Sequence, residues 1–229
     1  MRAVDELIIL SEKRVWDMTT ETDGRLRDGE MLNVGIVIYD QVEELDFVGP
    51  YETFKAAGYQ AARLRGLETK LITVFTVAEK SGMVTTSGGL RVQPDYSFAD
   101  APAINLLVIP GGYAGPQMEN PAMQEWLARV TPQARINSSV CNGALILAKT
   151  GLLDGHAATT HWGAIDRLAE LFPSITVKRD VRWVDEGSIV TAAGVSAGID
   201  MSLHLVERLF GRDVAEDTAH YMEYRWNEN

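Results

Sequence analysis

The sequence predicts an α/β fold built on a mainly parallel sheet, because strand-like and helix-like stretches alternate along the chain. The run at 33–39 is short, continuous and β-branched, as expected of a strand buried on both faces. Further strands are expected at 71–77, 105–109 and 134–140. Helical stretches between them would supply the crossovers that parallel neighbours need.

The first half of the chain gives one helix and one hairpin. A polar turn at 40–46 follows the first strand, and the first helix is expected at 47–57. Pro50 is compatible with a first helical turn, where its missing N–H costs nothing. After the second strand, a glycine-containing turn within 81–96 predicts a hairpin.

The middle of the chain leads into the cysteine. The strand at 105–109 stops abruptly at Pro110-Gly111-Gly112, and a helix is expected at 121–130. The central strand at 134–140 then runs directly into Cys141, and an alanine- and leucine-rich helix begins at once.

The C-terminal third continues the alternation. A helix is expected at 163–171, two short strands flank 186–188, and a long helix opens near Ser196. The long helix presents one apolar stripe, and a final helical piece carries three aromatic residues. The stripe is Ile199, Leu203, Val206 and Phe210, and the aromatic residues are Tyr221, Tyr224 and Trp226.

Composition narrows the class of protein. The 229 residues are 46% hydrophobic and 23% charged, which is enough to bury a large core. A formal charge of −11 and a pI near 4.8 argue against nucleic acid and anionic membranes, which require a basic face. Small molecules or proteins are the expected partners.

The single cysteine and the short apolar runs predict a cytoplasmic protein. One cysteine forms no intrachain disulfide, so a reducing compartment is expected. No run approaches the roughly 18 apolar residues of a spanning helix, and the run at 7–10 is too short for a signal peptide. No metal-ligand cluster is apparent. The expected cofactor and metal content is therefore none.

The chain divides at Met31. Residues 1–30 are mixed and polar and read as an N-terminal extension, and 31–229 as a single domain. The extension is expected to pack on the domain or on a second subunit rather than to hang free.

Cys141 is the candidate nucleophile. It lies on a strand-to-helix turn, where the first free N–H groups of the helix favour negative charge, so its thiol is expected to ionise. Ligands in parallel sheets bind beyond the carboxyl ends of the strands. Asp46 and Gly111-Gly112 follow other strands and are expected at the same edge.

Five ordered motifs resemble the ThiJ/PfpI superfamily, which is class I glutamine amidotransferase-like, over roughly 31–211. They are ELDFVGP at 44–50, IPGG at 109–112, SVCNGA at 139–144, GLLDG at 151–155 and ATTHW at 158–162. Within the superfamily the chain is most similar to the bacterial isocyanide hydratases.

The resemblance implies a flavodoxin-like sandwich with helices on both faces, a homodimer, no metal and a small-molecule substrate. It implies that the Cys141 thiolate attacks the terminal carbon of an isocyanide and that the resulting thioimidate is hydrolysed to an N-substituted formamide. Asp46 matches the aspartate that faces the cysteine in the hydratases, where most relatives carry glutamate. Asn142 departs from the pattern, because the hydratases have threonine there.

Elementary chemistry supports the same roles. Thiolate addition to a neutral carbon requires a nearby acid, and a carboxyl beside a thiolate in a partly dry pocket keeps its proton longer than in water. Asp46 could then act as acid first and as base toward water second. The backbone N–H groups of Gly112 and Asn142 are expected to bind developing charge.

Each site residue also has a structural reading. Cys141 could be a small buried hydrophobe, Asp46 a helix N-cap, and Gly112 part of a tight turn. His161 could approach Cys141, or it could be a satisfied structural histidine. Tyr113 and Trp162 could contact substrate, or pack in the wall or core.

Two other function classes stay open on the sequence alone. One is a different cysteine enzyme of the superfamily, acting on reactive carbonyls such as glyoxals, or a redox-responsive thiol protein. The other is a non-catalytic ligand-binding module, since similar domains head some transcription regulators. The acidic balance of this chain disfavours contact with DNA.

Overall fold

Seven strands form one central sheet in the order β10-β11-β7-β6-β1-β2-β5 in the computed structural model, which describes residues 25–26 and 29–228. Every neighbouring pair is parallel except β10 and β11. The mainly parallel α/β sheet is therefore confirmed. The strands are β1 (Leu32–Val37), β2 (Ile72–Ala78), β5 (Tyr96–Ser97), β6 (Leu106–Ile109), β7 (Ile136–Val140), β10 (Trp183–Asp185) and β11 (Ile189–Ala192).

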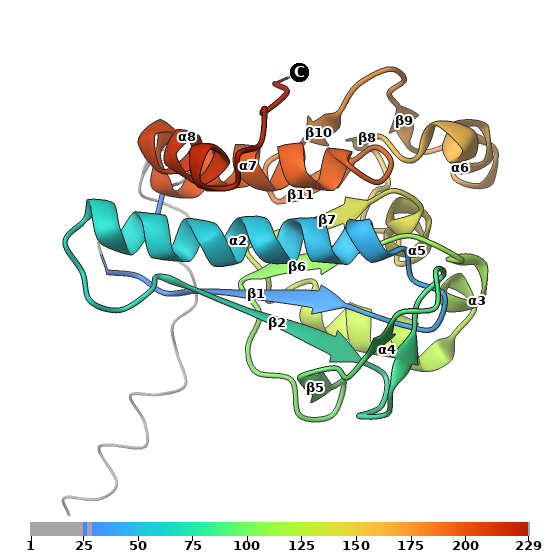
Figure 1. Cartoon of the computed structure of the whole chain (residues 1–229). Helices are drawn as coiled ribbons and strands as arrows, with labels where there is room; N and C mark the ends of the chain where they lie inside the picture. The colour runs from blue at the N-terminus through green and yellow to red at the C-terminus, as the bar shows by residue number, and fades with distance from the viewer. Residues whose placement is uncertain (1–24, 27–28, 229) are drawn as a thin grey trace, which may run out of the picture.

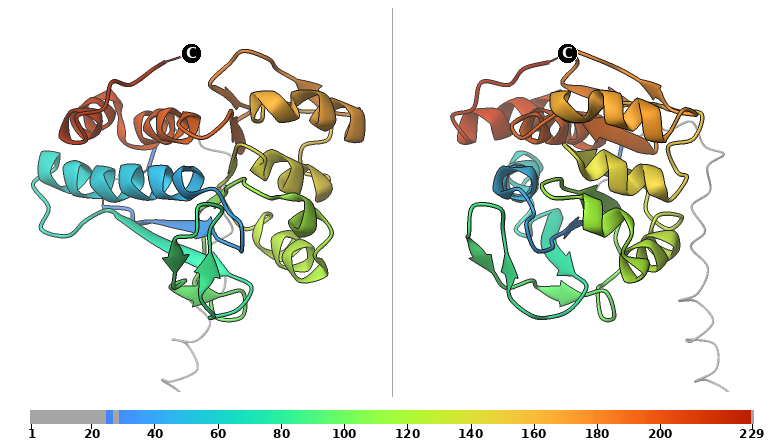
Figure 2. Two further views of the ribbon diagram at one scale, coloured as in Figure 1. Left: turned by 45° about the vertical axis from the view of Figure 1, so that its right-hand side comes forward. Right: turned by 90° about the vertical axis from the view of Figure 1, so that its right-hand side faces the viewer.

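Helices cover both faces of this sheet (Figure 1, Figure 2). The helices α2 (Glu44–Leu64) and α7 (Ala197–Phe210) pack on one face, and α8 (Arg212–Tyr221) lies against both of them. The other face carries α3 (Gly115–Met118), α4 (Pro121–Val130) and α5 (Gly143–Lys149).

Smaller elements complete the domain. The predicted hairpin is β3 (Val84–Thr85) paired antiparallel with β4 (Arg91–Val92). Beyond the β10 end of the sheet lie α6 (Ile165–Leu171), a 3-10 turn at Trp162–Ala164, and the two-stranded pair β8 (Ala157–Ala158) and β9 (Thr176–Val177).

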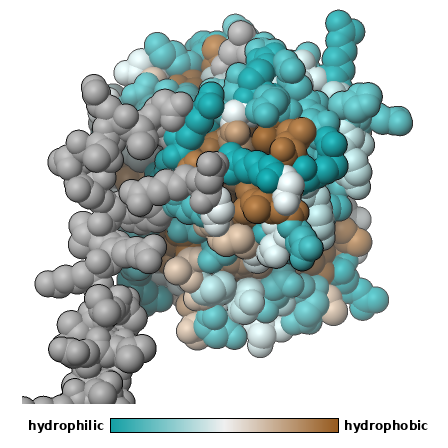
Figure 3. Space-filling model, turned by 90° about the vertical axis from the view of Figure 1, so that its left-hand side faces the viewer, coloured by the Kyte–Doolittle hydropathy of each residue, from teal (hydrophilic) through white to brown (hydrophobic). Residues whose placement is uncertain are grey.

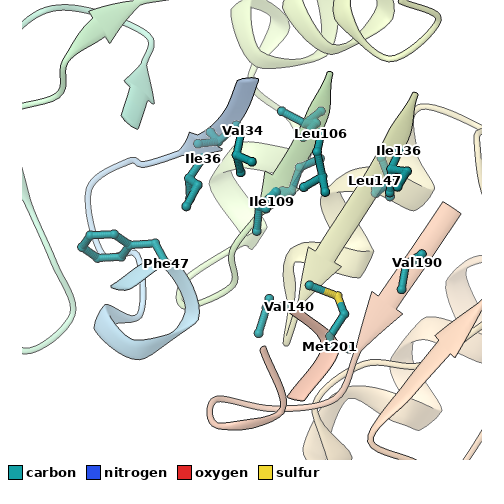
Figure 4. Packing of buried hydrophobic residues seen from close by; sticks show 14 of the residues in the cluster. Val34, Ile36, Phe47, Leu106, Ile109, Ile136, Val140, Leu147, Val190 and Met201 are labelled. Atoms are coloured by element: carbon teal, nitrogen blue, oxygen red, sulfur yellow. The ribbon is translucent and has the colours of Figure 1, made fainter. Parts of the chain in front are cut away.

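The core fills the space between sheet and helices. Val34, Leu106 and Ile136 come from the adjacent strands β1, β6 and β7 and are at most 1% exposed. Figure 4 shows these side chains on neighbouring strands, with Met201 of α7 near the end of β7. Burying one such side chain contributes about 1.5–3 kcal/mol, so the sheet is a rigid base for whatever its carboxyl ends carry.

Two helix boundaries differ from the prediction. The first helix begins at Glu44 and ends at Leu64, so Pro50 lies in its second turn rather than its first. The last helix ends at Tyr221, and Tyr224 and Trp226 follow it in an irregular segment instead of continuing the helix.

The N-terminal extension lies mostly outside the described residues, and so does the prediction that it packs on the domain. Leu26 is described: it is 6% exposed, and its N–H donates to the Leu209 carbonyl at 3.0 Å. The domain surface at the end of the molecule where the strands begin has apolar side chains near its centre and a largely hydrophilic surround (Figure 3). Among the described helices none is long and apolar enough to cross a membrane.

Candidate active site

Cys141 forms a sharp turn between β7 and α5, at the edge where the parallel strands end (Figure 1). Its φ of +57° is a left-handed conformation that an L-residue with a side chain adopts at a cost of about 1–3 kcal/mol. Two hydrogen bonds hold it there. Cys141 N–H donates to the Ala193 carbonyl at 2.9 Å, and the Thr160 hydroxyl donates to the Cys141 carbonyl at 2.7 Å.

Asp46 comes to the same point from the first turn of α2. Its side chain is fully buried, and Oδ2 accepts the Gly111 N–H at 2.9 Å. Among the described residues, Oδ1 has no hydrogen-bond partner. The N-cap of α2 is Glu43, so the reading of Asp46 as a helix cap is wrong. A buried carboxyl oxygen without a partner is free to handle a proton.

Gly111 is the residue on which the site converges. A Cβ at this position would lie 2.9 Å from Asp46 Oδ2, 2.9 Å from the Cys141 Cβ and 2.5 Å from the Asn142 nitrogen. Only a glycine leaves room for that approach. The structure therefore brings Asp46, Cys141 and Asn142 together around one backbone position.

The pKa values of the two titratable groups place the proton on the Cys141 sulfur and let Asp46 give or take a proton near neutral pH. Burial, opposed by the hydrogen bond from Gly111, raises the pKa of Asp46 from 3.8 to about 7. Burial and the negative charge of Asp46 raise the pKa of Cys141 from 9.0 to about 12, because each disfavours the charged thiolate. The expectation that this thiol is ionised at rest is therefore wrong: burial outweighs the helix N-terminus, and the resting sulfur carries its proton.

Two further residues at the site escaped sequence reasoning. The Val195 N–H lies near Asp46 and Cys141 and lowers the pKa of each. The Tyr39 hydroxyl is shared between the Pro110 and Gly111 carbonyls at 2.9 and 2.8 Å. The sequence around neither residue marks it as part of the site. Val195 follows β11, far along the chain from Cys141, and Tyr39 reads as the end of a strand.

Gly112 and Asn142 are joined by a side-chain hydrogen bond, and the binding of developing charge by their backbone N–H groups stays a prediction. The Asn142 side-chain Nδ2 donates to the Gly112 carbonyl at 3.1 Å. Gly112 has a φ of +100° and lies against the turn that precedes α2, where it bridges to Val42. The asparagine thus ties the glycine loop to the nucleophile turn, a bond that its amide group provides. Its Oδ1 is buried without a hydrogen-bond partner among the described residues.

The aromatic candidates are exposed rather than in the core. Tyr113 is 67% exposed and Trp162 83% exposed, so core packing is excluded for both. His161 caps the 3-10 turn, because its Nδ1 accepts the Gly163 N–H at 3.1 Å. This bond places the proton of neutral His161 on Nε2. A structural role for His161 fits this contact.

Across the described part of the chain no group of three or more His, Cys, Asp or Glu side chains could hold a metal ion. The site consists of a thiol, a carboxyl and backbone N–H donors. Such a set can add the sulfur to an electrophilic carbon and move protons within the resulting adduct.

Known proteins are similar to this chain in sequence. A model of the DJ-1/PfpI family matches residues 33–208. An isonitrile hydratase of Pseudomonas putida is 36% identical over 194 residues, which cover 84% of this chain and 78% of the hydratase. A helix-turn-helix transcriptional regulator of Pseudomonas aeruginosa is 32% identical over 134 residues, which cover 58% of this chain and 40% of the regulator.

Solved structures share the fold. A ThiJ/PfpI family protein from Pseudomonas syringae superposes with a TM-score of 0.75 at 27% identity, covering 96% of this chain and 85% of that one. Drosophila melanogaster DJ-1beta superposes with a TM-score of 0.72 at 19% identity, covering 86% of this chain and all of that one. Enzymes and regulators thus occur among the relatives.

Proposed function

This chain belongs to the DJ-1/PfpI family, and we propose that it is an isocyanide hydratase that works through a covalent bond to Cys141. The observation that carries the proposal is the buried carboxyl of Asp46 beside the thiol, with a pKa raised to about 7 by burial. A group of that pKa can give and take a proton at neutral pH. The 36% identity to an isonitrile hydratase points to the same chemistry.

The first half-reaction joins the sulfur to the substrate. The Cys141 sulfur attacks the terminal carbon of R–N≡C while its proton passes to the Asp46 carboxylate. Asp46 then delivers that proton to the same carbon, which gives the thioimidate R–N=CH–S–Cys141. One S–H bond is broken, and one C–S bond and one C–H bond are formed. The N–H groups of Val195 and Asn142 stabilise the negative charge that appears during the attack.

The second half-reaction releases the product. Water adds to the thioimidate carbon as Asp46 takes one of its protons and passes it to the nitrogen, giving R–NH–CH(OH)–S–Cys141 and a free Asp46 carboxylate. Collapse breaks the C–S bond and forms the formamide R–NH–CHO, and the hydroxyl proton returns to the sulfur through Asp46. The balance is one isocyanide and one water consumed for one formamide.

Two features of the chain bear on substrate and assembly. Tyr113 and Trp162 are exposed aromatic side chains in the loops next to Gly112 and His161, where they could contact the R group. A homodimer in the cytoplasm, with no metal or cofactor, is part of the proposal.

The decisive experiment is turnover of an aromatic isocyanide, followed by chromatography of the formamide. The intact protein should form it, and Cys141→Ala should not. Mass spectrometry after an acid quench should show wild-type protein heavier by the mass of one isocyanide. Absence of formamide from a panel of aromatic and aliphatic isocyanides would refute the proposal.

A ligand-binding module is the second candidate, because the chain is also similar to transcriptional regulators. That role predicts retention of an isocyanide or another small molecule without release of product. Equilibrium dialysis on the intact protein, run beside the turnover assay, separates binding without chemistry from catalysis.

A further inference from the structure

The short connection between β11 and α7, residues 193–196, supplies a backbone donor to the active site. The Val195 N–H in this connection lies close enough to the Cys141 sulfur and the Asp46 carboxyl to lower the pKa of both. The preceding Ala193 carbonyl accepts the N–H of Cys141 at 2.9 Å. Any displacement of the connection would therefore reach both reacting groups.

Arg182 holds this connection at both ends. Its carbonyl accepts the Ala193 N–H at 2.9 Å, and its Nη2 donates to the Ser196 hydroxyl oxygen at 3.2 Å. The main chain of Arg182 fixes the side before Val195, and its guanidinium fixes the side after it. The position of the guanidinium thus helps to set the position of the Val195 peptide.

Asp200 in turn fixes the guanidinium. This carboxylate is fully buried in the first turns of α7 and accepts hydrogen bonds from Arg182 Nε at 2.8 Å and from Nη2. Its other oxygen accepts from the Tyr224 hydroxyl and from the Asn227 N–H, each at 3.0 Å. A buried charge is tolerated only when it is satisfied in this way.

The last two donors come from the segment after α8, residues 222–228. Tyr224 N–H donates to the Ala219 carbonyl at 2.9 Å, which turns the segment back from the end of the helix. Farther on, the Arg212 guanidinium lies 4.8 Å from the centre of the Trp226 ring and pairs with Glu228 at 2.7 Å. The C-terminal segment is thereby held against Asp200 in the first turns of α7.

We propose that Asp200 and the C-terminal segment 222–228 are positioning elements of the active site, which act through Arg182 on the Val195 N–H that faces Cys141 and Asp46. The chain of contacts runs from Tyr224 to Asp200, from Asp200 to Arg182, and from Arg182 to both ends of the Val195 connection. The predicted effect on turnover rests on the proposed hydratase function. The predicted effect on the reactivity of the Cys141 thiol does not depend on that function.

Tyr224→Phe is the sharpest perturbation, because it removes one hydrogen bond to Asp200 and no packing surface. Tyr221→Phe is the matched control: its ring is 58% exposed, so its hydroxyl is free to interact with water. The primary measurement is the rate of alkylation of Cys141 by iodoacetamide between pH 7 and 10. It requires no isocyanide, so it tests the inference even if the hydratase function fails.

Loosening the Val195 N–H removes a contact that favours the thiolate, so alkylation should slow. We expect about a threefold lower rate across this pH range for Tyr224→Phe and about tenfold for Asp200→Asn, with Tyr221→Phe equal to wild type. In the isocyanide assay kcat should fall by similar factors with KM within twofold. Arg182→Lys should retain more of both rates than Arg182→Met, since the ammonium can still reach Asp200.

Folded Tyr224→Phe and Asp200→Asn proteins with wild-type alkylation profiles would overturn the inference. A lower melting temperature with an unchanged alkylation profile in the folded protein would also overturn it, because that result is a purely structural role. Slower alkylation of the variants in a protein that hydrates no isocyanide would sustain the inference and refute the proposed function.

Discussion

Replacing Asp46 by asparagine should make the sulfur of Cys141 more reactive and abolish most of the proposed isocyanide hydration. The substitution keeps the size of the side chain but removes the charge that opposes the thiolate. The pKa of Cys141 stands at about 12 rather than 9.0, with burial as the larger cause and the Asp46 charge as the second. This rise corresponds to about 4 kcal/mol in favour of the thiol.

The thiol stays buried in the variant, so removal of the Asp46 charge should cancel only about 1–1.5 kcal/mol of the roughly 4 kcal/mol that favours the thiol over the thiolate. Alkylation of Cys141 by iodoacetamide at pH 8–9 should then be roughly fivefold to tenfold faster than in wild type. Isocyanide hydration should fall by about 10²–10⁴, because the group that moves the protons is gone. Asparagine can still accept the Gly111 N–H, which preserves the local geometry.

The opposed signs make this prediction easy to refute. Equal or slower alkylation of Asp46→Asn would show that the carboxyl does not hold the proton on the sulfur. If the alkylation rate of the wild-type protein reached a plateau below pH 8, Cys141 would be a thiolate at rest. That result would refute the premise of this prediction, which is a protonated thiol. Hydration within threefold of wild type would remove Asp46 from the mechanism.

Three more outcomes follow from the same site. Burial raises the pKa of Asp46 from 3.8 to about 7, so the folded protein loses stability as pH rises from about 4 to about 7. Urea unfolding should therefore show Asp46→Asn near wild type at pH 4 and up to about 4 kcal/mol more stable at pH 8. Gly111→Ala places a Cβ 2.5 Å from a backbone nitrogen and should lower kcat/KM at least about 100-fold, whereas Gly115→Ala, which meets nothing within 4 Å, should stay within twofold. Trp162→Ala and Tyr113→Ala remove exposed rings, so calorimetry should show melting temperatures within about 1 °C of wild type, while KM for aromatic isocyanides rises several-fold and KM for small aliphatic ones does not.

Strong local patterns were enough to predict most of the fold. The helix at 121–130 has the predicted bounds, and the four long parallel strands lie within two residues of their expected positions. The first helix is longer than predicted, because it continues through Gly58 to Leu64. A Cβ at Gly58 would lie 3.0 Å from Ile72, so this glycine allows close packing of α2 on β2 within a continuing helix. A tertiary contact of that kind leaves no local trace.

The site was partly predictable for a similar reason. Cys141 and Asp46 each follow a strand of a parallel sheet, and the topology brings such positions together. Val195 also follows a strand, β11. It acts through its backbone N–H, so its residue type does not distinguish it. Its N–H matters only because β11 pairs with β7 and places the two connections side by side. The protonation state was mispredicted because burial, which outweighs the helix terminus, cannot be read from a turn motif.

A protonated resting thiol discriminates between the functions open to this family. Oxidation of cysteine follows thiolate character and access to solvent, and Cys141 is 5% exposed with a pKa raised by burial to about 12. A buried, protonated thiol therefore favours the proposed hydratase over a redox-responsive role. An isocyanide requires something different, namely a nucleophile and a proton delivered to the same carbon. A thiol beside a carboxylate of pKa about 7 supplies both, since the proton that leaves the sulfur is the one the carbon receives. In the proposed mechanism the raised pKa of Cys141 favours an electrophile that also accepts the proton of the thiol.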